Sequence, residues 1–149
     1  MKIIEFRPEY KAALIDISLE WLKKYDVLED VDVEMVNHPE KILDCGGHIL
    51  LAQTDAGEII GIVMIENQGD CCELLKLGVR ESAQGKGAGK KLIDAAVQIA
   101  RQEEMKKIVL CSNHKLKTAL HLYEKAGFRY TMYEQNHFAL SDISMEFIL

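Results

Sequence analysis

Hydrophobic and polar positions follow two different periods along this chain, and the changes of period outline its elements. Short apolar runs predict strands, which fall at residues 2–6, 48–54, 58–66, 72–79, 107–112, 128–134 and 141–149. Apolar residues three and four positions apart predict helices over 8–24 and 116–127, and a third directly after a glycine-rich stretch at 85–89. The acidic segment 25–41 shows neither period, so we expect irregular chain there with a short helix after Pro39.

The order of these elements predicts the fold class. The first strands follow one another closely, and the turn at 55–58 between two of them is typical of a hairpin. Later strands alternate with helices, which is typical of crossover connections. A chain of 149 residues suits one domain, so we expect a single α/β (α+β) domain over 1–149. Its mixed central sheet should carry helices on both faces.

The composition limits the classes of binding partner and the cellular compartment that we expect for this protein. The net charge of −6 argues against a nucleic-acid or membrane partner, because such partners select basic surfaces. The four cysteines show no metal-binding spacing, so we expect no metal and reduced thiols. The N-terminus lacks the apolar stretch of a signal peptide, and no run approaches the roughly 20 apolar residues of a membrane span. These observations predict a cytoplasmic protein.

The glycine-rich stretch joins a predicted strand to a predicted helix, an arrangement that favours phosphate binding. It is not a nucleotide P-loop, because residue 91 is Lys where a hydroxyl is needed and residue 84 is Gln where Gly is needed. It is not a dinucleotide fingerprint either, because residue 90 is Lys. Backbone N–H groups in a tight turn before a helix can still hold an anion. The alternative is a plain connector with solvated lysines.

Two stretches resemble one known family. ELLKLGVRESAQGKGAGKKLIDAAVQIAR (73–101) contains the pattern Gln-x-x-Gly-x-Gly, and IVLCSNHKLKTALHLYEKAGFRY (108–130) follows it. Both are similar to motifs of the GNAT superfamily of acetyl-CoA-dependent N-acetyltransferases, in particular to bacterial small-molecule members. The resemblance extends from about residue 45 to the C-terminus. It implies a sheet of about seven strands that splays between the fourth and fifth.

The resemblance also implies how acetyl-CoA would be held. Its pyrophosphate would lie on the loop, and its pantetheine arm would pair with the strand before the loop and with an amide side chain. The implied cofactor-binding residues are Leu77, Val79, Gln84, Gly85, Lys86, Gly87, Ala88, Gly89, Lys90 and Asn113.

Acetyl transfer to an amine needs a base, oxyanion stabilisation and a proton for the leaving thiolate. The resemblance assigns these tasks to Glu73, the backbone N–H of Val79 and Tyr123. The alternative for Glu73 is a solvent-facing or substrate-orienting charge, and the alternative for Tyr123 is a core aromatic residue. We expect no catalytic histidine, and no acyl-enzyme on Cys72 or Cys111.

The acceptor site is expected from residues 20–38 and 133–141, with Trp21, Tyr25, Tyr133 and His137 as candidate lining residues. The acids of this region form either a wall for a cationic amine or a solvated surface. The expected function is direct acetyl transfer to a primary amine of a small molecule or amino acid. Alternatives are a protein or peptide acceptor, or a non-catalytic acyl-CoA-binding module. The resemblance leaves a homodimer open.

Overall fold

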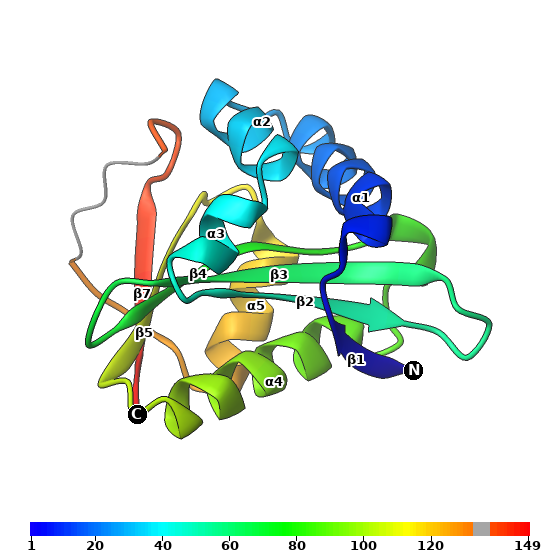
Figure 1. The fold of residues 1–149 in the computed structure, drawn as a ribbon. Helices are drawn as coiled ribbons and strands as arrows, with labels where there is room; N and C mark the ends of the chain where they lie inside the picture. The colour runs from blue at the N-terminus through cyan, green and yellow to red at the C-terminus, as the bar shows by residue number, and fades with distance from the viewer. Residues whose placement is uncertain (133–137) are drawn as a thin grey trace.

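The computed structural model describes residues 1–132 and 138–149. Within these residues one seven-stranded sheet has the order β1-β2-β3-β4-β5-β7-β6 (Figure 1). Among the described strands only β4 and β5 pair in parallel, so the prediction of a mixed sheet is confirmed. The strands are β1 (Lys2–Glu5), β2 (His48–Gln53), β3 (Ile59–Asn67), β4 (Cys72–Val79), β5 (Lys107–Ser112), β6 (Arg129–Tyr130) and β7 (Ile143–Ile148).

The helices cover both faces of the sheet, as predicted (Figure 1). Helices α1 (Lys11–Lys24), α2 (Asp30–Asn37) and α3 (Glu40–Asp44) pack on one face, and α4 (Ala88–Gln102) and α5 (Lys117–Ala126) on the other. Short 3₁₀ turns, η1 (Pro8–Tyr10) and η2 (Glu81–Ala83), precede α1 and α4. Each face has its own core: Leu14 and Ile17 of α1 are buried on one, and Leu92 and Ala96 of α4 on the other. No helix of the described residues is long and apolar enough to cross a membrane.

Helix α2 occupies part of the segment for which the sequence predicts irregular chain. It begins with a capping box, in which the side chain of Glu29 accepts from the third residue of the helix and the side chain of Asp32 accepts from Glu29 N. Its buried residues are Asp32 and Val36, one turn apart. A carboxylate therefore stands where an apolar residue would have revealed the helical period.

Strand β6 is shorter than the predicted strand over 128–134. Phe128 lies before it and is buried between Tyr123 and Phe147, with ring centroids 5.7 and 5.3 Å away. Tyr130 ends the strand, and Met132 is fully exposed. Phe128 therefore packs in the core and Arg129 begins a short strand at the edge of the sheet, instead of both belonging to one long strand.

Strand β4 creates the opening in the sheet. Ile62 of β3 pairs with Gly78 and Met64 pairs with Leu75, so β4 carries one extra residue in a bulge at this point. Within the bulge, Lys76 has a φ of 56°. The ladder between β4 and β5 contains only two pairs, Cys72 with Ile108 and Glu73 with Val109. Beyond them the strands diverge, which confirms the predicted splay.

Candidate active site

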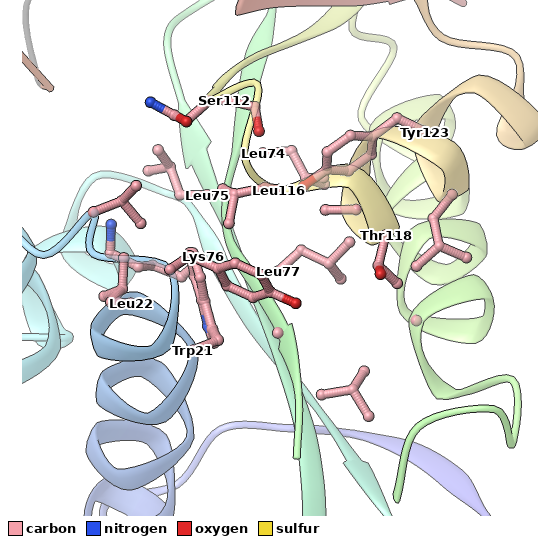
Figure 2. Close-up of a pocket in the computed structure, with 18 of the residues that line it drawn as sticks. Trp21, Leu22, Leu74, Leu75, Lys76, Leu77, Ser112, Leu116, Thr118 and Tyr123 are labelled. Atoms are coloured by element: carbon pink, nitrogen blue, oxygen red, sulfur yellow. The ribbon is translucent and has the colours of Figure 1, made fainter. Parts of the chain in front are cut away.

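A cleft of about 390 Å³ opens where β4 and β5 diverge. Its lining comes from both faces of the sheet. Trp21 and Leu22 of α1 lie on one side of β4, and Thr118 and Tyr123 of α5 lie on the other (Figure 2). A ligand that bridges the two faces through the gap in the sheet would fit this shape.

The glycine loop leads into one end of the cleft. Gly87 is the N-cap of α4 and has a φ of 84°, a left-handed conformation that favours glycine. Gly85 has the same φ, and a Cβ atom at either position would meet no atom within 4 Å. Within the described residues no side chain caps α4, so its first backbone N–H groups stay available to an anion. These features fit a pyrophosphate group.

The lysines around the loop differ in their positions. Lys90 lines the cleft but donates to Asp94 one turn along α4, at 2.7 Å. Lys86 is exposed and is not among the residues that line the cleft. Gln84 lines it, and its side-chain nitrogen lies 3.5 Å from the carbonyl oxygen of Val79. The backbone N–H groups, rather than an array of lysines, are therefore the groups at this end of the cleft that are free to hold an anion.

Tyr123 lines the cleft from α5 and is 7% exposed. Its ring packs against Phe128, which fixes its position. Burial raises the pKa of the Tyr123 phenol, so the hydroxyl stays protonated through the neutral range. His121, two residues earlier, is exposed and does not line the cleft, as the helical period predicts.

Glu73 lies at the closed end of the splay, on the last residue pair that joins β4 to β5. It is fully buried, so the alternative of a solvent-facing charge is wrong. Gln68 donates to its Oε1 at 2.8 Å. Glu73 is not among the residues that line the cleft. A proton from the cleft would need a relay to reach it.

A buried ion pair, Asp32 with Lys76, lies in the wall of the cleft on the α1–α3 face. Both side chains are almost inaccessible, and the ammonium of Lys76 also lies 4.2 Å from the ring centroid of Phe138. Burial lowers the pKa of Lys76, and the neighbouring carboxylates oppose that shift. The pattern of the sequence does not predict this pair. Asp32 stands in an acidic run and Lys76 in a strand, and the only local signal is the capping-box spacing of Glu29 and Asp32.

Two polar side chains hold the described part of the segment before β7 against the cleft. The side chain of Asn113 donates to Leu140 O at 2.6 Å and accepts from Lys115 N at 2.9 Å. Glu29 accepts from Ala139 N at 2.9 Å and from Leu140 N at 3.2 Å. The N-cap residue of α2, the β5–α5 connection and residues 138–141 therefore share one wall.

Known protein families and structures that resemble this chain are consistent with the cleft described above. Residues 12–128 match the acetyltransferase (GNAT) family. The chain belongs to the acetyltransferase (GNAT) family. It is 33% identical over 91 residues to the uncharacterized N-acetyltransferase YjgM of Escherichia coli, a match that covers 58% of this chain and 54% of that protein. The chain therefore matches about half the length of this curated relative.

Solved structures of the GNAT fold superpose over almost the whole chain. A GNAT acetyltransferase of Staphylococcus aureus Mu50 has a TM-score of 0.87 at 22% identity, covering 97% of this chain and 96% of that one. The PaiA N-acetyltransferase of Thermoplasma acidophilum, solved in complex with coenzyme A, has a TM-score of 0.76 at 21% identity over the full length of both chains. These likenesses confirm the fold.

The structure brings most of the residues predicted from the GNAT resemblance into one cleft. Lys86 and Glu73 stand outside its lining. Trp21 and Tyr25 line it, whereas Tyr133 and His137 lie outside the described residues. The predicted residues within the lining are Leu77, Val79, Gln84, Gly85, Gly87, Ala88, Gly89, Lys90, Asn113 and Tyr123.

Proposed function

We propose that this protein transfers an acetyl group from acetyl-CoA directly to a primary amine of a small molecule. The observation that carries the proposal is the shared cleft: the glycine loop at the start of α4 and the buried hydroxyl of Tyr123 border the same space. If the glycine loop were only a connector, nothing would require it to border the same cleft as the buried phenol of Tyr123. Membership of the acetyltransferase family supports this interpretation.

In this proposal the backbone holds the cosubstrate. The pyrophosphate binds the N–H groups of 85–90, where glycine leaves the backbone open and the helix dipole adds attraction. The pantetheine arm pairs with β4 near Leu77 and Val79, beyond the last residues that pair with β5. Asn113 borders the same space from the end of β5. Its side-chain amide already forms hydrogen bonds with two backbone groups of the protein. Asn113 would therefore act by holding this edge of the cleft in place as much as by bonding the pantetheine arm.

The remaining residues move protons. An alkylamine with a pKa of about 10 is mostly protonated at neutral pH and must lose a proton before it attacks. Glu73 is the proposed acceptor of that proton, reached through water because its side chain does not line the cleft. Tyr123 donates a proton to the leaving thiolate, and burial keeps its hydroxyl protonated until that step. The backbone N–H of Val79 is the proposed partner of the oxyanion.

Direct transfer needs no nucleophile from the protein, and the cysteines support this route. Cys111 lines the cleft, but burial raises the pKa of its thiol to about 11. The pKa of Cys72 is also raised to about 11, and Cys72 does not line the cleft. A thiol that stays protonated at neutral pH is a poor acyl acceptor.

The proposal is tested by calorimetric titration with acetyl-CoA, CoA and ATP, followed by a thiol-release assay with amines, amino acids and peptides. We expect both CoA compounds to bind and ATP not to bind, and small amines to release CoA. Absence of CoA binding would leave the loop as a connector and overturn the proposal. Turnover with peptides alone would move the acceptor to proteins, and binding without turnover would indicate an acyl-CoA-binding module.

A further inference from the structure

The charged groups at the acceptor end of the cleft are already paired within the chain. The acceptor end is the part of the lining on the α1–α3 face, and among its described residues the charged ones are Glu29, Asp32 and Lys76. Asp32 Oδ1 accepts from Lys76, and its Oδ2 accepts from Glu29 N at 2.8 Å. Both carboxylate oxygens of Glu29 accept from the backbone of 139–140. Part of the accepting capacity of both carboxylates is therefore already used within the chain, which leaves less of it for an additional cation.

This arrangement disfavours an acceptor with several positive charges. A polyamine brings two or more ammonium groups, and each one that enters without a partner carries a desolvation cost. The described charges of the acceptor end leave one net negative charge, from two carboxylates and one ammonium. That charge matches a single ammonium group.

The same arrangement disfavours an acceptor that carries a carboxylate. Lys76 is the cation of the acceptor end among the described lining residues, and it already holds Asp32. The negative charges of Glu29 and Glu73 also act on it. A further carboxylate would be placed beside carboxylates, and the described lining of this end offers no second cation to balance it.

Most of the rest of the described acceptor end is apolar or aromatic, and Ser141 is a polar residue beside it. Trp21 and Tyr25 come from α1 and its end, and Phe138 and Leu140 come from the segment before β7. The described apolar and aromatic residues of this end are Trp21, Leu22, Tyr25, Val27, Leu75, Phe138 and Leu140. Such a lining gains free energy by removing an apolar body from water.

We propose that the acceptor is a primary monoamine attached to an uncharged apolar body, of the aryl-alkyl or branched-alkyl class. This inference rests on the proposed function and names its substrate class. The apolar body packs between Trp21 and Tyr25 on one side and Phe138 on the other. The amine is then directed toward the bulge of β4, where the sheet opens.

Trp21 supplies a direct readout, because it is the single tryptophan of the chain. It lines the cleft, and its indole Nε1 is buried with no hydrogen-bond partner among the described residues. Its fluorescence therefore reports on acceptor binding without any need for turnover. The first experiment titrates the intact protein, saturated with CoA, with isoamylamine, spermidine or leucine. We expect isoamylamine to change the fluorescence at concentrations at least about tenfold lower than the other two.

The second experiment compares kcat/KM for isoamylamine and phenethylamine with kcat/KM for spermidine and leucine. A preference of about tenfold or more for the apolar amines supports the inference. Equal or better use of spermidine or leucine overturns it and leaves the proposed function intact. If acetyl-CoA does not bind, or no amine or peptide is acetylated, the proposed function fails. The fluorescence titration, repeated on the protein without CoA, then decides the inference alone, and no response to isoamylamine overturns it.

A matched pair of variants tests the placement. Tyr25 and Tyr10 flank the two ends of α1, and only Tyr25 lines the cleft. Tyr25→Ala should lower kcat/KM for the apolar amines by about fivefold or more without changing the KM for acetyl-CoA. Tyr10→Ala should leave both constants unchanged. An equal effect of the two variants would assign the loss to the helix rather than to the acceptor site and would overturn the placement.

Discussion

At the scale of single residues, Tyr123 is the side chain on which the proposed chemistry depends most directly. Tyr123→Phe removes the hydroxyl and keeps the ring that packs on Phe128. We expect turnover to fall more than tenfold, with acetyl-CoA affinity nearly unchanged, because the leaving thiolate loses its proton donor. Steady-state kinetics beside calorimetric binding measures both quantities. Wild-type turnover would remove Tyr123 from the mechanism.

The role of Glu73 as general base needs a separate test. Its burial is compatible with a base, but it lies outside the cleft lining, so the proton would have to reach it through a relay. Glu73→Gln keeps the size of the side chain and the partner Gln68. If Glu73 accepts the proton, the acidic limb of the pH–rate profile should move or disappear, and kcat at neutral pH should fall by about 10²-fold or more. An unchanged profile would leave Glu73 as a structural residue of the β4–β5 junction.

The cysteines give a prediction of pH dependence. The pKa of Cys111 is raised to about 11 by burial, so its reactive thiolate fraction falls about tenfold for each pH unit below that value. Iodoacetamide labelling of Cys111 should therefore be slow at neutral pH and rise steadily toward pH 11. Labelling of the exposed Cys45, followed by peptide mass spectrometry, is the internal control. Fast labelling of Cys111 at neutral pH would reopen an acyl-enzyme route.

At the scale of elements, the glycine loop and α4 act together. Gly87→Ala places a side chain at a φ of 84°, which costs about 1–2 kcal/mol of stability and adds a Cβ atom beside the helix N-terminus. Gly57 is the matched control: it has a φ of 91°, and a Cβ atom there would also meet nothing within 4 Å. Both variants should lose similar stability in urea unfolding. Only Gly87→Ala should raise the KM for acetyl-CoA, and an equal KM in both would contradict the anion site.

At the scale of the whole molecule, the pair of Asp32 and Lys76 ties α2 to the bulge of β4, 44 residues apart in the chain. Lys76→Met leaves a buried carboxylate without its partner and should cost about 3–5 kcal/mol of unfolding free energy. The double variant Asp32→Asn with Lys76→Met removes both charges and keeps an oxygen that can accept from Glu29 N. It should recover most of the loss in urea unfolding. A double variant as unstable as Lys76→Met would show that the ion pair itself is not the source of stability.

The sequence by itself determined most of the sheet and one wall of the cleft. The apolar runs at 72–79 and 107–112 became β4 and β5 with unchanged bounds, because local periodicity and β-propensity agree there. The glycine pattern placed the start of α4 within two residues, since the helix begins at Ala88 rather than after Gly89. The helical period placed Tyr123 inward and His121 outward. In each case the information lies within a few residues of the feature, where local sterics and helix geometry act.

Only the tertiary structure decided the acceptor side. In the sequence Asp32 cannot be told apart from the other acids of its polar run. In the fold Lys76 lies against it, and the burial of Asp32 gives α2 the face that packs inward. The position of Glu73 behind the cleft depends on where β4 and β5 stop pairing, which no local pattern of either strand encodes. Charge pairing and burial depend on contacts between distant segments, so their consequences for acceptor chemistry became visible only in the folded chain.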